Sequence, residues 1–180
     1  MVPNEGQLLA RALNRYERSR FKLAVLAAMP SLLLPAIAFT VGGRLAFSAT
    51  LGVGIWGAVV LLAWRGREWG MSVPLGLLAG AVPLSLALLA QTIGHVCTPQ
   101  GCTTFCVPMC AAGGAIAGLV IAAAARRSPA PLVTLGCGAA LSLAVGSMGC
   151  ACVGAAGMLG MGAGLVASMG VAVAAHRHAH

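Results

Sequence analysis

Charged residues are scarce in this chain, and acidic ones are almost missing. The 180 residues include 3 Asp and Glu against 11 Lys and Arg, so that only 8% are charged, where a soluble domain averages about 25%. This deficit excludes an ordinary cytosolic globular domain. Intrinsic disorder is excluded as well, because disordered segments are poor in apolar residues, whereas 59% of this chain is hydrophobic.

Aromatic residues and catalytic motifs are also few. Aromatics make up 4% of the chain, too few for a surface on which nucleic-acid bases stack, and the basic residues behind the net charge of +8 lie in short clusters between apolar runs. Such clusters indicate contact with anionic lipid headgroups. The only carboxylates, Glu5, Glu17 and Glu68, have no histidine nearby in sequence, and no P-loop, G-x-S-x-G or H-E-x-x-H pattern occurs. The sequence therefore predicts neither direct nucleic-acid binding nor enzymatic activity.

Long apolar sequence is what the chain has in abundance. Residues 69–125 and 128–176 contain no Asp, Glu, Lys or Arg, and one membrane-spanning helix takes about 20 apolar residues. The apolar runs show no alternation with polar residues, which argues against a β-barrel. We predict an all-α fold, an integral membrane bundle of six transmembrane helices over residues 22–42, 45–64, 71–94, 107–125, 130–149 and 152–175.

The basic residues predict the orientation of this bundle. Five lie between residues 11 and 22, two at 65–67, two at 126–127 and one at 177, whereas Arg44 alone lies on the opposite side. Cytoplasmic loops carry the excess of Lys and Arg, so we expect both termini in the cytoplasm and the bundle in a bacterial inner (cytoplasmic) membrane. The chain then divides into a cytoplasmic amphipathic segment (1–21), the transmembrane domain (22–175) and a cytoplasmic tail (176–180).

Glycine, with 25 residues, is about twice as frequent as usual. Three pairs are spaced four residues apart: Gly76 and Gly80, Gly114 and Gly118, and Gly160 and Gly164. This spacing puts two small residues on one helix face, where two helix backbones approach closely. We interpret the pairs as contacts within the bundle rather than between subunits, and the sequence leaves the oligomeric state open.

Six of the seven cysteines are expected at the outer face, and the seventh, Cys137, lies inside the fifth apolar segment. The six are Cys97, Cys102, Cys106, Cys110, Cys150 and Cys152, with His95 beside them. Three interpretations stay open: disulfide bonds, a soft or borderline metal site or redox sensor built from thiolates, and packing as small apolar side chains. Met148, Met158, Met161 and Met169 suggest a path for a soft metal through the last two helices, but their irregular spacing is more typical of gap-filling.

The N-terminal segment has an amphipathic pattern of its own. Asn4 and Gln7 have the spacing of a capping box, and the apolar residues that follow recur on one helical face: Leu8, Leu9, Ala12, Leu13 and Tyr16. Basic residues occupy the opposite face. Such a helix either lies on the inner leaflet or inserts its apolar face in the groove of a partner.

Two stretches and the overall plan resemble the bacterial membrane-spanning anti-sigma factors of the NrsF type. The stretches are Cys106-Val-Pro-Met-Cys110, followed by an apolar helix that ends at Arg126-Arg127-Ser-Pro-Ala-Pro131, and Gly146-Ser-Met-Gly-Cys150. The resemblance implies that the N-terminal segment holds an extracytoplasmic-function sigma factor through Leu8, Leu9 and Leu13. It also implies that Cys106 or Cys110, together with Cys150, takes part in sensing. The alternative function is that of a membrane protein that binds or transports a soft metal.

Overall fold

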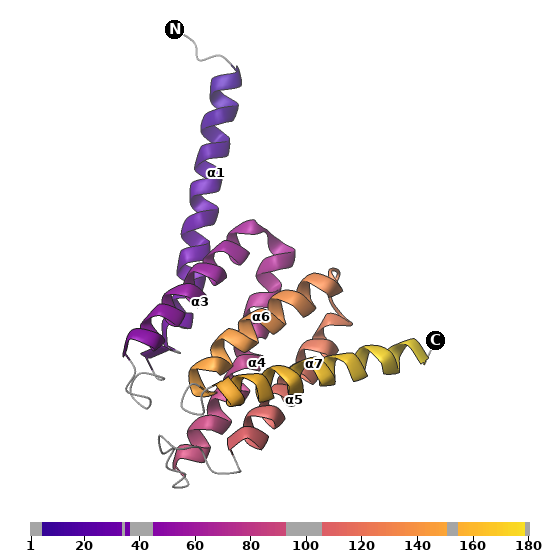
Figure 1. The fold of residues 1–180 in the computed structure, drawn as a ribbon. Helices are drawn as coiled ribbons and strands as arrows, with labels where there is room; N and C mark the ends of the chain where they lie inside the picture. Colours follow the sequence, from indigo (N-terminus) through magenta and orange to yellow (C-terminus); the bar gives the residue numbers. More distant parts are fainter. Residues whose placement is uncertain (1–4, 34, 37–44, 93–105, 151–154, 179–180) are drawn as a thin grey trace.

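The computed structural model describes residues 5–33, 35–36, 45–92, 106–150 and 155–178, and every regular element in these ranges is helical. The elements are α1 (Glu5–Ala28), the 3₁₀ turn η1 (Met29–Leu32), α3 (Leu45–Arg65), α4 (Arg67–Thr92), α5 (Cys106–Ala125), α6 (Pro131–Cys150) and α7 (Ala155–His178) (Figure 1). The predicted all-α class is confirmed for the described part of the chain.

Four helices are long and apolar enough to cross a membrane. Their apolar stretches are Trp69–Leu89, Val107–Ala125, Pro131–Gly149 and Ala155–Ala175, and α3 adds a shorter one, Ala49–Arg65. Large apolar side chains cover the outside of these helices; Leu78 is 70% exposed and Leu159 is 72% exposed. In water this large apolar surface would be exposed to solvent, which monomeric soluble proteins avoid. In a membrane, lipid chains cover it. The chain is a multi-pass membrane protein.

The first predicted segment differs from the others. α1 runs without a break from Glu5 to Ala28, so the boundary expected between residues 21 and 22 falls inside a helix. The reason is local, because no proline or glycine interrupts the sequence between Gly6 and Pro30, and a helix once begun propagates at little cost. Pro30 lies in the first turn of η1. The rest of the predicted segment, residues 37–42, lies outside the described residues.

α4 with α6, and α5 with α7, form the most extensive contacts of the bundle. Both pairs are parallel. A Cβ added to Gly76 would lie 2.8 Å from Leu141 Cβ, and one added to Gly80 would lie 2.7 Å from Val145 Cβ. Residue numbers therefore rise in the same direction along α4 and α6. On the other pair, a Cβ on Gly114 would overlap the backbone of Met161, and one on Gly118 would overlap Ser168 and Leu165.

The predicted role of the glycine pairs is therefore confirmed. Gly160 faces Val107, and a Cβ on Gly164 would overlap the Ala111 carbonyl, so α5 and α7 each present small residues to the other. Backbones this close gain van der Waals contact, which drives helix association in lipid. All three pairs lie in contacts inside the bundle.

α1 and α3 form an antiparallel hairpin at the side of this core. The Arg20 guanidinium donates to the Trp64 carbonyl at 2.9 Å, while a Cβ on Gly52 would lie 2.7 Å from Pro35 Cβ. Residue numbers thus rise along α1 as they fall along α3. Ala24 and Ala28 are buried in one core cluster with Ile55 and Val59 of α3. The first half of α1 extends beyond the bundle (Figure 1).

The connections define two ends of the bundle. α3 and α4 are joined by Gly66 alone, whose φ of 149° suits glycine and strains other residues. α5 and α6 are joined by residues 126–130, where Arg126 donates to the Ala172 carbonyl of α7 at 2.9 Å. We call this the basic end, since Arg65 and Arg126 lie there. The opposite end, where α5 begins at Cys106 and α6 ends at Cys150, is called the cysteine end.

Candidate functional site

The N-terminal half of α1 carries an exposed apolar stripe. Leu9, Leu13 and Tyr16 are 65%, 62% and 61% exposed, and their spacing of four and three residues puts them on one helical face. The neighbouring positions from Arg11 to Ser19 are exposed as well, so the other elements of the described structure cover little of this part of α1. We call Leu9, Leu13 and Tyr16 the α1 stripe. Leu8 lies in α1, and its side chain is outside the described residues.

Aromatic and basic side chains link α1 to α3 on the C-terminal side of the stripe. The rings of Phe21 and Trp64 meet edge to face with centroids 6.1 Å apart, an arrangement that aromatic pairs prefer. The Arg20 guanidinium lies 5.6 Å from the centre of the Tyr16 ring, within reach of a cation–π interaction. Because the same guanidinium binds the Trp64 carbonyl, the end of the stripe is tied to the end of α3.

Two cavities lie near α3. One of about 430 Å³ lies between α3 and α6, and a larger one of about 660 Å³ lies beside the stripe. The larger one is bounded by Tyr16 and Arg20 of α1, Ala63 of α3, and Gly70 and Met71 of α4. The stripe therefore leads into a hollow at the basic end. A helix laid along α1 would meet apolar side chains first and the hollow next.

The cysteines are placed less completely. Cys97, Cys102 and Cys152, together with His95, lie outside the described residues. Cys106 is the first residue of α5 and Cys150 the last residue of α6. Because α5 and α6 are each 20 residues long and antiparallel across a short turn, these two helix ends lie at the same end of the bundle. The structure thus puts positions 106 and 150 at the same end of the bundle and does not describe their side chains.

Cys110 lies one turn inside α5 and is buried. Its side chain is 3% exposed and packs with Met161 of α7, which is 1% exposed. Cys110 and Cys137 are both thiols, but Cys137 is partly exposed and lines the cavity between α3 and α6. Sequence reasoning did not pair Cys110 with Met161. The signal was the glycine spacing on α5 and α7, which brings the two helices into close contact.

The described residues contain no group of three or more His, Cys, Asp or Glu side chains arranged to hold a metal ion. Three of the four methionines suggested as a path lie in separate core clusters. Met148 packs with residues of α3 and α4, Met161 with Cys110, and Met169 with a separate cluster around Leu165. Each fills its own part of the core, as the gap-filling interpretation expects.

No protein-family model matches the chain, and no curated protein or solved structure matches it either.

Proposed function

We propose that this protein is an anti-sigma factor of the bacterial inner membrane. In this proposal the bundle crosses the membrane six times with both termini in the cytoplasm, and α1 carries its first half into the cytoplasm. There the α1 stripe holds an extracytoplasmic-function sigma factor. Cysteines at the opposite end respond to a metal or redox signal outside the cell membrane.

The observation that carries the proposal is the exposure of the α1 stripe. The three side chains of the stripe are more than 60% exposed on a helix that projects from the bundle, so the described protein covers little of their apolar surface. Amphipathic helices of this kind bind in an apolar groove of a partner. The resemblance to NrsF-type proteins names the partner as a sigma factor, and the hollow beside Tyr16 and Arg20 enlarges the surface available to it.

The rival occupant of the stripe is the inner leaflet, since basic amphipathic helices also lie on lipid. The direction of α1 favours a protein partner. Arg20 is level with Trp64 at the end of α3, and the residues before it continue away from the bundle along the same helix axis (Figure 1). A helix that lies on the membrane surface would instead bend sharply near residue 20.

The test is capture of the partner by the full-length chain. Tagged protein is purified from its own bacterial membranes in mild detergent, and co-purifying proteins are identified by mass spectrometry. We expect a sigma factor with the natural chain and at least a tenfold loss with Leu13→Glu, because a carboxylate cannot enter an apolar groove without a large desolvation cost.

Asn14→Glu is the matched control, since it adds the same charge at the next residue, off the stripe. The proposal fails if no sigma factor is recovered with the natural chain. It also fails if Leu13→Glu and Asn14→Glu recover the same amount.

One observation favours the second candidate, a protein that binds or carries a soft metal. Cys110 and Met161 bring a thiol and a thioether together in the core, and both groups select soft ions. Binding of Ag(I) to the purified chain, measured by calorimetry, separates the two functions. A stoichiometric site that is lost with Met161→Leu would favour the carrier, whereas the anti-sigma proposal expects no dependence on Met161.

A further inference from the structure

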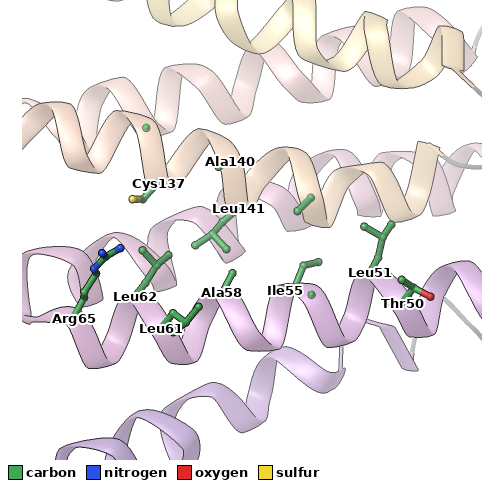
Figure 2. A pocket seen from close by; sticks show the side chains of 13 residues that line it. Thr50, Leu51, Ile55, Ala58, Leu61, Leu62, Arg65, Cys137, Ala140 and Leu141 are labelled. Atoms are coloured by element: carbon green, nitrogen blue, oxygen red, sulfur yellow. The ribbon is translucent and has the colours of Figure 1, made fainter.

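An elongated cavity runs between α3 and α6 on the outside of the bundle. Its volume is about 430 Å³, within the range of pockets that bind small molecules. Figure 2 shows Arg65 at one end of this cavity and Thr50 at the other, with Cys137 projecting from α6 on the Arg65 side. We call it the α3–α6 groove.

The lining of the groove is apolar over most of its length. The side chains include Leu51, Ile55, Leu61, Leu62 and Leu141, and the one charged residue is Arg65. Two glycines widen it, because a Cβ added to Gly54 or Gly136 would meet no atom within 4 Å. The groove is thus a long apolar channel with a single cation at one end.

The tryptophans around Arg65 indicate the level where a membrane meets water. The Arg65 guanidinium is 5.9 Å from the centre of the Trp69 ring. Trp64 precedes Arg65 in the chain, and its carbonyl accepts a hydrogen bond from Arg20. Tryptophan collects at the headgroup level of bilayers. From Arg65 to Thr50 the helix rises about 22 Å at 1.5 Å per residue, more than half of the roughly 30 Å hydrocarbon core. The groove is therefore long enough for one acyl chain of a single leaflet.

We propose that the α3–α6 groove binds one anionic phospholipid, with an acyl chain along α3 and α6 and the phosphate at Arg65. In the hydrocarbon region the groove faces lipid, and an empty channel would lose the dispersion contacts of its whole lining. An acyl chain restores them. The headgroup then meets Arg65, the one charged residue of the lining, and such a cation attracts anionic lipids.

The experiment is native mass spectrometry of the full-length chain purified in detergent. The protein is mixed with phosphatidylglycerol and phosphatidylcholine of identical acyl chains, and the lipid retained per chain is counted. We expect one retained lipid, with phosphatidylglycerol favoured about fivefold for one basic residue at the surface. Arg65→Gln should remove this preference, and Arg127→Gln, a charge at the same end that does not line the groove, should keep it.

Two variants place a larger side chain in the groove, each from a position where the Cβ meets no atom within 4 Å. Gly54→Leu and Gly136→Leu place a side chain in open space on either wall, and leucine raises helix propensity over glycine. Each should lower lipid retention at least tenfold. Gly57→Leu is the control, because its Cβ also meets nothing within 4 Å and it lies outside the groove lining.

A photoactivatable phosphatidylglycerol, with its reactive group on the acyl chain, locates the lipid directly. Cross-links should map to residues 50–65 and 136–144. Undiminished retention in both filled variants overturns the proposal, as does cross-linking confined to other helices. A stable dimer that Gly54→Leu and Gly136→Leu both dissociate would assign the groove to a second copy of the chain instead.

Discussion

Single glycines set how closely the helices of this bundle approach. Where a glycine faces a neighbouring backbone, as Gly114 faces Met161, no other residue fits without moving a helix. The pairs at four-residue spacing were predictable, because the spacing itself defines a helix face. Gly146 was not, since its requirement comes from the Met161 thioether, whose Sδ would lie 2.6 Å from an added Cβ. That contact depends on how two distant helices are arranged.

Gly114→Ala should lower the stability of the bundle. Its Cβ would overlap the Met161 backbone, and a clash with backbone is relieved only by separating α5 from α7, at a cost of about 1–3 kcal/mol. Unfolding by denaturant in detergent micelles measures the change. Gly170→Ala is the control, because its Cβ meets nothing within 4 Å. Equal stability of the two variants would contradict the close contact.

Met161→Ala should also destabilise the protein, in this case by leaving a cavity rather than by creating a clash. Met161 is 1% exposed and packs with Cys110, so truncation leaves a cavity that costs about 2–5 kcal/mol. Met71→Ala removes the same atoms from a side chain that is 49% exposed and should change the stability by about 0.5 kcal/mol or less. The same unfolding assay applies. A loss no larger for Met161→Ala than for Met71→Ala would argue against a packed core there.

At the scale of elements, α1 joins an exposed amphipathic half and a half packed on α3 in one helix. Its amphipathic first half was predictable from the spacing of Leu9, Leu13 and Tyr16, which repeats every helical turn. Its continuation to Ala28 was not predicted, because the change from charged to apolar sequence near Lys22 was interpreted as a boundary. Helical hydrogen bonds do not depend on that change. As a result, any force on the first half of α1 is transmitted to its contact with α3.

Phe21→Ala should loosen the attachment of α1 to α3. The Phe21–Trp64 ring pair is worth about 0.5–1.5 kcal/mol beyond its buried area, so amide hydrogen exchange over residues 21–28 should accelerate by roughly threefold to tenfold. Leu26→Ala is the control, since Leu26 on the same helix is 64% exposed. If exchange were unchanged in Phe21→Ala, the ring pair would not hold the hairpin together.

On the scale of the whole molecule, charge predicts which helix ends lie together, whereas packing decides which helices pair. The clustering of Arg and Lys predicts which ends of the helices share a face, and the structure puts Arg65 and Arg126 at one end. The pairing of α4 with α6 and of α5 with α7 was not predictable. Small residues recur on all four helices, so the sequence is compatible with several pairings. Side-chain volume at each crossing selects among them.

The proposed topology predicts where a reporter is active in a bacterial membrane. Alkaline phosphatase, which folds only outside the cytoplasm, should be active when fused after residue 43 or residue 100. It should be inactive after residue 129 or residue 180. The fusion at residue 43 tests the first crossing alone, because the four helices of the described structure that are long and apolar enough to span a membrane begin only with α4. Activity after residue 129 would show that the bundle has the opposite orientation in the membrane.

The last prediction concerns signalling from the cysteine end to α1. The parallel pairs give a route, because α5 begins and α6 ends at the cysteine end, and each is packed along its length against a partner that reaches the basic end. A disulfide or shared metal that ties position 106 to position 150 would link the two pairs. A disulfide is worth about 2–4 kcal/mol, comparable to the 1–3 kcal/mol of typical allosteric coupling, so such a tie is strong enough to shift the pairs against each other.

We therefore expect Cys106→Ser and Cys150→Ser each to abolish the response of a sigma-dependent reporter to thiol oxidants or soft metals, with the protein level unchanged. Ser147→Ala is the matched control on α6, because the Ser147 hydroxyl donates only to the Ala144 carbonyl of its own helix in the described structure, at 2.7 Å. A normal response in both cysteine variants would contradict signalling through these thiols. Loss of the protein itself, rather than of its response, would assign the cysteines to a structural bond, since a bundle that needs the tie to fold cannot use its making or breaking as a signal.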